Sequence, residues 1–119
     1  MNLSEKEIEK HLVSDFPNLS IGDIKIIDRQ RDIDSGVLDI LAETDDYYIV
    51  IELKIETATA SCIAQTMSYL YDIDDEFYKD CIAFVVAEGF SESVWKTKRY
   101  IDDLHLYKYN LSIDIHRYC

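Results

Sequence analysis

Two carboxylates and a lysine at close spacing form the clearest chemical signal in the sequence. Asp39 is followed, after twelve intervening residues, by Glu52-Leu53-Lys54. Side chains alternate between the two faces of a strand, so Glu52 and Lys54 share one face while Leu53 points the other way. If the two segments pair as a hairpin about the turn 44–46, Asp39 lies laterally close to Glu52 and the ammonium group of Lys54 lies beside both acids.

Such a group of residues could carry out metal-assisted hydrolysis of a phosphodiester. Two carboxylates buried together are costly unless a cation or a proton joins them. Magnesium suits one or two carboxylates combined with water and a substrate phosphate, and Lys54 could hold the attacking water and stabilise charge on the phosphorus oxygens. The alternative is structural, with Asp39 a polar residue near a turn and Glu52–Lys54 a salt bridge at a sheet edge. The break that Glu52 and Lys54 make in an apolar strand favours the catalytic interpretation.

Further polar side chains could serve the same site. Gln65 and Tyr69 lie four residues apart and so on one face of a helix, and together with Thr66 they could hold a catalytic water or a phosphate. The alternative is a surface glutamine above a half-buried tyrosine. Near the N-terminus, Glu5 lies in the first turn of another helix. There it could deliver a further acid to the site, or remain a solvated carboxylate favoured by the helix dipole.

The elements that must hold these residues are predicted from apolar periodicity and from turn signals. The stripe Ile63, Met67 and Leu70 marks the buried side of a helix. The acidic residues 72–79 are expected to form a loop, and Gly89 is expected to end a strand. The predicted helices span about 4–16, 59–71 and 91–102, and the predicted strands span 24–29, 37–43, 47–54 and 81–87, with a last strand or pair of strands at 104–109 and 111–115.

The order of these elements is α-β-β-β-α-β-α-β. A helix between two strands implies a crossover connection, so strand 81–87 is expected to run parallel to strand 47–54. Strand 47–54 is so apolar that it is expected at the centre of the sheet. The order predicts a mixed α/β sandwich, with a central sheet flanked by helices, built as one domain over residues 1–119.

The charge balance argues against a polyanion as partner. The chain of 119 residues has 12 Lys and Arg against 24 Asp and Glu, a net charge of −12. Such a surface repels nucleic acid at long range. A nucleic-acid substrate must therefore be held by a local site, where magnesium could supply part of the missing positive charge.

Cysteine usage and hydropathy indicate the compartment. Cys62, Cys81 and Cys119 are odd in number and lack zinc-ligand or CxxC spacing, which favours free thiols in a reducing cytoplasm. No apolar run approaches the roughly 18 to 20 residues that cross a bilayer, and residues 1–10 lack the apolar core of a secretory signal. A cytoplasmic protein without a membrane partner is therefore expected.

Taken together, these motifs resemble the PD-(D/E)xK nuclease superfamily, and most closely the C-terminal nuclease domain of NucS-type endonucleases. The glycine–aspartate strand of that family corresponds to Gly36–Leu41, its E-x-K strand to Ile51–Lys54, and its Q-x-x-x-Y helix to Gln65–Tyr69. Glu5 corresponds to the glutamate of its first helix, and Arg29-Gln30-Arg31 to a polar, basic strand end. Each motif is weak alone, but their order along the chain makes the resemblance fairly specific.

The resemblance implies a restriction-endonuclease-like three-layer α/β/α sandwich with a central mixed sheet, and an endodeoxyribonuclease that depends on Mg²⁺ or Mn²⁺. It also implies roles for single positions. The metal-binding positions would be Asp39, Glu52 and Leu53, with Lys54 positioning water, Gln65 and Tyr69 supporting the site, and Glu5 as an accessory acid.

The implied partner is DNA, with single-stranded, flap or branched forms favoured. So small a domain is expected to need a second copy or a protein partner to grip a duplex, and the aromatic residues Tyr107, Tyr109 and Tyr118 could form a dimer surface or simply pack in the core. Two other interpretations stay open. One is a non-catalytic acidic interaction or inhibitor protein on a nuclease fold, encoded by a phage or mobile element. The other is a nuclease for small nucleotides or RNA, because an acidic exterior hampers a short ligand less than a long polyanion.

Overall fold

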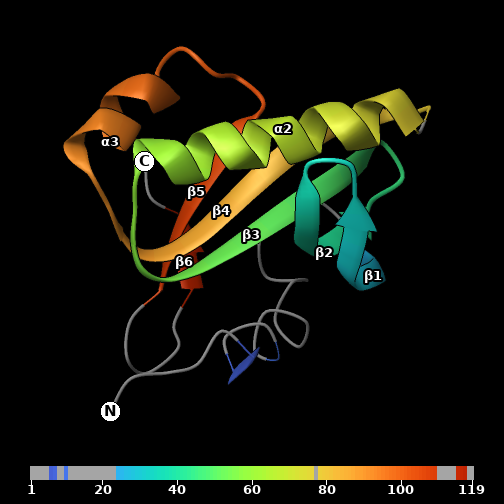
Figure 1. Cartoon of the computed structure of the whole chain (residues 1–119), viewed down its shortest axis with the longest axis horizontal. Helices are drawn as coiled ribbons and strands as arrows, with labels where there is room; N and C mark the ends of the chain where they lie inside the picture. The colour runs from blue at the N-terminus through green and yellow to red at the C-terminus, as the bar shows by residue number, and fades with distance from the viewer. Residues whose placement is uncertain (1–5, 8–9, 11–23, 77, 110–114, 118–119) are drawn as a thin grey trace.

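The computed structural model describes residues 6–7, 10, 24–76, 78–109 and 115–117, and its centre is a six-stranded mixed sheet in the order β1-β2-β3-β4-β5-β6 (Figure 1). The elements are β1 (Lys25–Ile33), β2 (Gly36–Glu43), β3 (Tyr47–Ala58), α2 (Ala60–Glu76), β4 (Asp80–Phe90), α3 (Glu92–Lys98), β5 (Leu104–Tyr109) and β6 (Ile115–Arg117). The predicted α/β class and the predicted order after the first helix are confirmed. Of that first helix only Lys6, Glu7 and Lys10 are described, and they are helical; Glu5 lies outside the described residues.

The sheet separates two hydrophobic clusters. On one face, buried residues of α2 and α3 pack with Val50, Val85 and their neighbours. On the other face, Ile49, Ile51 and Leu53 of β3 pack with residues of β2, β4 and β5. The central strand β3 is therefore buried on both sides, as its run of branched and aromatic residues predicts. Figure 1 shows both labelled helices on the same side of the sheet.

β3 and β4 run parallel, and α2 forms the crossover between them, as predicted. The prediction that Gly89 ends β4 is wrong. Both strands continue past the expected point, and after an irregularity between Lys54 and Thr57 they pair again at Thr57 with Gly89. Because the two strands extend together, the backbone of Gly89 keeps a ladder partner and the strand does not stop there.

The prediction of a loop over residues 72–79 is also wrong for its first half, because α2 continues to Glu76. Ile73 is fully buried and continues the helical spacing of the buried side. Two acids on either side of Ile73 have partners on the β1–β2 hairpin: the Asp72 carboxylate accepts a hydrogen bond from the backbone N–H of Ser35 at 2.9 Å, and Glu76 pairs with Arg31 at 2.7 Å. Tertiary contacts thus hold a negatively charged helix C-terminus, which the helix dipole alone disfavours.

The buried side of α2 is rotated relative to the predicted stripe. Ile63 is buried as expected, but Met67 and Leu70 are only half-buried. The other buried positions are Cys62, Thr66, Tyr69 and Ile73. This rotation places the tyrosine, rather than the leucine beside it, against the sheet.

The C-terminal third differs from the prediction mainly in its boundaries. α3 ends at Lys98, four residues earlier than expected, because the backbone tightens there: Tyr100 N–H donates to Thr97 O and Ile101 N–H to Lys98 O. β5 matches its predicted range and pairs parallel to β4. β6 is described at Ile115–Arg117, so Ile115 of the predicted range 111–115 lies in a strand, and residues 110–114 lie outside the described part. No helix of the described residues combines the length and apolar character that crossing a membrane requires.

Candidate active site

The β2–β3 hairpin brings Asp39 and Glu52 together. The antiparallel ladder pairs Ile40 with Ile51 and ends there, one step before Asp39 and Glu52 would face each other. The two side chains replace the missing ladder bonds. The N–H of Asp39 donates to Glu52 Oε1 at 3.1 Å, and the N–H of Leu53 donates to Asp39 Oδ2 at 2.8 Å. Each carboxylate is therefore held by the backbone of the opposite strand.

A backbone irregularity in the neighbouring strand lies opposite Asp39. β1 pairs with β2 through Arg29–Ile40 and Arg31–Leu38, which places Gln30 across from Asp39. Gln30 has φ of 51°, a left-handed conformation that non-glycine residues adopt rarely and at an energetic cost of roughly 1 to 3 kcal/mol. Leu38 packs on the α2 side whereas Ile40 packs on the other side, so the strand alternation is broken between them. The sheet is thus kinked at the aspartate.

Glu52 and Lys54 emerge on the face that α2 covers, as strand alternation predicts. Glu52 is 7% exposed and Lys54 is half-buried. Lys54 lines a cleft of about 520 Å³ between the end of β3 and the start of α2. Within the described ranges Lys54 forms no ion pair and no hydrogen bond. Its ammonium group is therefore not neutralised by a single fixed carboxylate.

The charges of Asp39 and Glu52 affect the pKa values of two α2 side chains, Tyr69 and Cys62. Burial raises the pKa of the Tyr69 hydroxyl, and the charges of Glu52 and Asp39 raise it further. Burial also raises the pKa of the Cys62 thiol, against the effect of Lys54, while Glu52 and Asp39 add to the rise. Both groups therefore stay protonated near neutral pH, and each could donate a hydrogen bond but neither is a ready base or nucleophile.

Gly36 explains how Tyr69 comes so close to the start of β2. Its φ is +143°, a value that L-residues rarely adopt. A Cβ atom at this position would lie 2.9 Å from the Tyr69 hydroxyl oxygen, which is closer than a real side chain tolerates. The glycine of the Gly–x–x–Asp motif is therefore needed for the packing of α2 on β2, which in turn sets the distance of Tyr69 from Asp39.

The remaining predicted residues divide into two groups. Gln65 is exposed and lines the same cleft as Lys54 and Cys62. Thr66 does not reach the site, because it is fully buried and its hydroxyl donates to Cys62 O at 2.8 Å. The Leu53 side chain is 1% exposed in the opposite core. Only the backbone of Leu53 is therefore available to bind a metal. The N–H and C=O of a strand residue point to the same side, and the Leu53 N–H donates to Asp39 on β2, so the Leu53 carbonyl also faces β2.

Basic residues of the segment before the Gly–Asp motif serve the fold. Arg31 pairs with Asp28 at 3.3 Å and with Glu76 of α2 at 2.7 Å. It therefore ties β1 to the C-terminal end of α2, away from the cleft.

Sequence reasoning missed the wall of the cleft. Besides the residues already named, it is lined by Glu56, Thr57, Thr59 and Ser61. The signal was present as short hydroxyl side chains at every second position, Thr57, Thr59 and Ser61, shortly after the E-x-K motif. Their position in the cleft depends on β3 continuing to Ala58, whereas the strand was expected to end at Lys54.

No cluster of three or more metal-binding His, Cys, Asp or Glu side chains occurs among the residues that the structure describes. The donor set at the site is a pair of carboxylates with a backbone carbonyl on the same side. Magnesium is commonly held by one or two carboxylates and completes its shell with water and substrate phosphate. The residues present therefore fit a magnesium ion better than a metal that demands an all-protein shell.

The six-stranded mixed sheet, its β-β-β-α-β-α-β-β order and its kinked hairpin define an α/β fold of the restriction-endonuclease-like class. Neither family models nor curated protein sequences match the chain. Solved structures do. A repair endonuclease from Pyrococcus abyssi superposes with a TM-score of 0.73 at 21% identity, covering 89% of this chain and 47% of that one.

Two structures of EndoMS are similar to the same degree. The apo form gives a TM-score of 0.72 at 21% identity over 91% of this chain and 47% of its own, and a complex with double-stranded DNA gives 0.71 at 20% over 88% and 44%. The chain therefore spans less than half the length of the structures that it resembles. At this identity the likeness establishes the shared fold, and it confirms the expected NucS-type nuclease architecture.

Proposed function

We propose that the protein is a divalent-metal-dependent nuclease that hydrolyses phosphodiester bonds of DNA. The observation that carries the proposal is the reciprocal contact between Asp39 and Glu52, in which each carboxylate is fixed by the other strand's backbone. Lys54 lies two residues after Glu52 on the same strand face and lines the adjoining cleft. Carboxylates fixed in this way are positioned before any ligand arrives, so binding a cation requires little rearrangement.

Asp39, Glu52 and the carbonyl of Leu53 would hold Mg²⁺ or Mn²⁺. A carboxylate has about four lone-pair directions, so one that accepts a backbone N–H can also bind a cation. The bound ion would polarise the phosphate and lower the pKa of a water molecule. The carboxylates of Asp39 and Glu52 would fix the position of the ion. The position of Asp39 in turn depends on the kink of the sheet between Asp39 and Gln30.

Lys54 and Gln65 would act on the substrate side. Lys54 donates to the attacking water or to a phosphate oxygen, and its charge stabilises the additional negative charge of the transition state. Gln65, exposed in the same cleft, orients water or phosphate through its amide. Tyr69, whose raised pKa keeps it protonated, supports the site by packing on Gly36. Glu5 remains a proposed accessory acid.

DNA is the proposed substrate because the similar structures are repair endonucleases, one of them in complex with double-stranded DNA. With a net charge of −12, the chain gains little from long-range attraction to a duplex. Single-stranded, flap or branched DNA is therefore the favoured form, and a second copy or a protein partner would supply the grip on paired DNA. We place the activity in the cytoplasm.

The test is a cleavage assay of the purified chain with single-stranded, flap, junction, duplex and RNA substrates, in Mg²⁺, Mn²⁺ or EDTA. Cleavage is expected with either metal and not with EDTA. Glu52→Gln should abolish it while keeping an acceptor for the Asp39 N–H, so that the fold survives. Asp45→Asn, an exposed acid in the turn of the same hairpin, is the matched control. A folded wild-type chain that cuts no substrate overturns the proposal.

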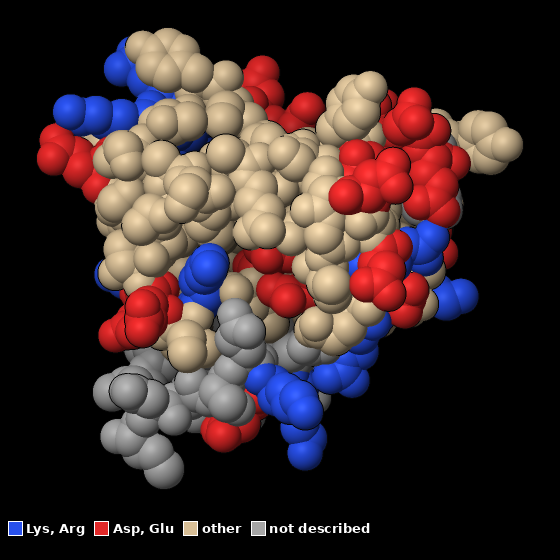
Figure 2. Space-filling view, viewed as in Figure 1, with Lys and Arg blue, Asp and Glu red and all other residues tan. Residues whose placement is uncertain are grey.

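One observation favours a second candidate, a non-catalytic protein that docks on a basic partner. Acidic side chains gather over the C-terminal end of α2, where Asp72, Asp74, Asp75 and Glu76 follow one another, and Figure 2 shows this red patch at the upper right. Binding through this patch would weaken with salt and would tolerate Glu52→Gln. That pattern, without any cleavage, would select this candidate.

A further inference from the structure

A second hollow lies on α3 and the turn that follows it. It has a volume of about 580 Å³ and is lined by two aromatic and three basic residues, Trp95, Lys96, Lys98, Arg99 and Tyr100. Trp95 is 54% exposed and Tyr100 is 82% exposed. Large aromatic side chains are usually covered in a soluble protein, so two of them open to solvent beside cations form a surface suited to a ligand.

This surface, which we call the α3 platform (residues 95–100), is positively charged in an acidic protein. Lys96 pairs with Glu92 at 3.0 Å. Lys98 and Arg99 form no ion pair within the described part of the chain. Figure 2 shows blue side chains gathered over α3 at the upper left, whereas the red patch lies at the other end of α2. The two ends of α2 therefore differ in charge, and the end next to α3 is the better placed of the two to attract a polyanion.

The platform lies close to the cleft of the candidate active site. The N–H of Ser91, directly before α3, donates to Ala58 O at the end of β3. Thr57 and Thr59, on either side of Ala58, line the cleft that contains Lys54. A helix of seven residues is about 10 Å long, so a few nucleotides of one strand would reach from the cleft to the platform.

We propose that the α3 platform binds the unpaired strand of a DNA substrate, with bases stacked on Trp95 and Tyr100 and phosphates held by Lys98 and Arg99. The inference deepens the proposed function and rests on it for the meaning of the platform. Exposed aromatic rings beside cations are the usual means of holding single strands, because every base has a stacking face. Bases in a duplex are already stacked on one another, so the platform selects unpaired DNA.

The direct test is a binding assay in EDTA, so that it is independent of cleavage. The probe is a fluorescent oligothymidylate of about 12 nucleotides, within the range of known single-strand sites. Tyr100→Ala should weaken binding roughly 5- to 100-fold, and Tyr100→Phe should retain it. The matched control is Tyr78→Ala, which removes a fully exposed tyrosine at the acidic end of the molecule and should change nothing.

Two further measurements separate stacking from charge. An abasic oligonucleotide of the same length keeps the phosphates but lacks the bases, and Tyr100→Ala should not alter its affinity. Lys98→Gln combined with Arg99→Gln should reduce the slope of log affinity against log salt by about 1.4, since each phosphate contact with a single strand contributes about 0.7. Lys25→Gln, an exposed lysine at the start of β1, is the charge control.

The outcomes distinguish this inference from the proposed function. If the wild-type chain does not bind the oligothymidylate, or if Tyr78→Ala weakens binding as much as Tyr100→Ala, the platform proposal is overturned even where cleavage occurs. If duplex DNA binds as tightly as the single strand and with the same dependence on Tyr100, it is also overturned. If binding follows the platform but no metal supports cleavage, the proposed nuclease fails and the platform stands.

Discussion

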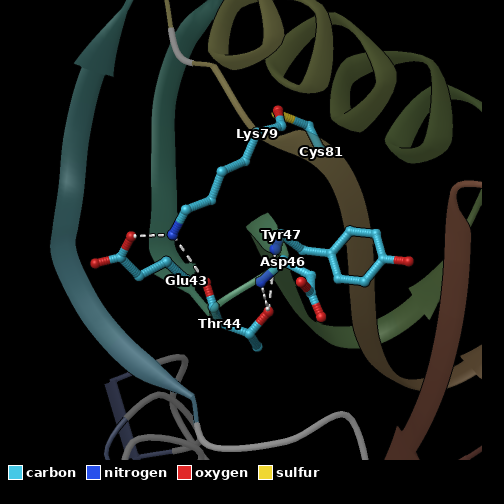
Figure 3. Close-up of polar contacts among 6 residues, drawn as sticks. All are labelled: Glu43, Thr44, Asp46, Tyr47, Lys79 and Cys81. Carbon is cyan, nitrogen blue, oxygen red and sulfur yellow. Dashed lines mark hydrogen bonds and ion pairs between the residues drawn. The ribbon is translucent and has the colours of Figure 1, made fainter.

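Acidic side chains lie near a lysine at both ends of the β2–β3 ladder, and the two groups differ in whether the lysine is paired. Lys79, from the connection between α2 and β4, lies at the turn end, and Lys54 of β3 lies at the other end. At the turn end, Lys79 donates to Glu43 Oε2 at 3.0 Å and to the carbonyl of Thr44 at 2.9 Å (Figure 3). Its ammonium group also lies 5.0 Å from the centre of the Tyr48 ring. The charge is therefore matched by three separate partners.

The backbone of the turn end is satisfied in the same way. The Thr44 hydroxyl oxygen accepts hydrogen bonds from the N–H groups of Asp46 and Tyr47, and the N–H of Thr44 donates to Tyr47 O. These contacts close the hairpin and keep its ladder intact from Tyr48 to Ile51. This end has the features of a structural ion-pair site.

At the other end the ladder stops, and the side chains of Asp39 and Glu52 take over its hydrogen bonds while Lys54 faces a cleft. Acids and a lysine thus form a fixed ion pair at the turn end, where Lys79 is bonded to Glu43. At the other end Lys54 has no such partner among the described residues and lines a cleft that a ligand could enter. The difference teaches that charge composition alone does not identify a site; what matters is whether the lysine is already neutralised.

The largest expected contrast between the two ends is in activity. Asp39→Asn should lower the cleavage rate by on the order of 10² to 10³-fold or more, because the charge of a proposed metal ligand is lost while the amide oxygen still accepts from Leu53 N–H. Glu43→Gln, the equivalent change at the turn end, should leave the rate within about twofold. Single-turnover cleavage with circular dichroism of each variant measures both. Equal losses at the two ends would remove the functional distinction.

A second contrast concerns the packing of α2 on the active end. Gly36→Ala should lower the free energy of unfolding by roughly 2 kcal/mol or more, because it combines backbone strain at φ +143° with a 2.9 Å approach to the Tyr69 oxygen. Urea denaturation measures the change. Tyr69→Phe removes that oxygen, so in the Gly36→Ala background it should recover part of the loss and leave the strain. Absence of coupling between the two substitutions would contradict this account.

The two lysines should respond oppositely to removal of their charge. Lys79→Met should lower the urea midpoint, because it leaves Glu43 and the Thr44 carbonyl without their donor. Lys54→Met should leave the midpoint unchanged or raise it, and should reduce the rate of cleavage. Denaturation and cleavage of the same two preparations provide the comparison. A drop in midpoint for Lys54→Met equal to that for Lys79→Met would show that Lys54 is structural.

The smallest expected effect is alkaline loss of stability at the turn end. Burial, reinforced by Asp74, raises the pKa of the Cys81 thiol from its usual 9.0 to about 12, and the hydrogen bond to Glu43 raises the pKa of Lys79. In both cases the folded state holds its proton more tightly than the unfolded state. The stabilisation is therefore complete below pH 9 and is lost as the pH rises towards 12.

Cys81→Ala should make this alkaline decline shallower between pH 9 and 12 without changing it at pH 7 to 8. Thermal unfolding across the pH series detects the difference. The same substitution at the other end, Cys62→Ala, provides the comparison, since burial raises the pKa of that thiol too. An unchanged pH profile for Cys81→Ala would show that its proton is not linked to folding.

Much of the fold was predictable because its signals are local. The apolar run of β3 indicated a central strand, and the helix between β3 and β4 indicated a parallel crossover; both were confirmed. The errors lie where distant contacts override local signals. The acids after Leu70 suggest a loop, yet Ile73 and the Arg31–Glu76 pair keep the segment helical. Gly89 suggests a break, yet its partner Thr57 keeps it in the sheet.

The candidate site was predictable in its residue types but not in its construction. Strand alternation placed Glu52 and Lys54 on one face, and the hairpin spacing placed Asp39 near them. The sequence could not show that each carboxylate accepts a hydrogen bond from a backbone N–H of the other strand. That arrangement requires the β2–β3 ladder to end at the pair Ile40 and Ile51. It also placed Thr66 towards the site, whereas the helix rotation buries its hydroxyl.

The sequence by itself determined the order of the elements, the two faces of each strand and the identity of the acids and the lysine, because these depend on neighbours within a few residues. The tertiary structure decided the left-handed Gln30 opposite Asp39, the approach of Tyr69 to Gly36, and the position of the α3 platform beside the cleft. These features arise from contacts between segments far apart in the chain, and only the packed fold sets their distances.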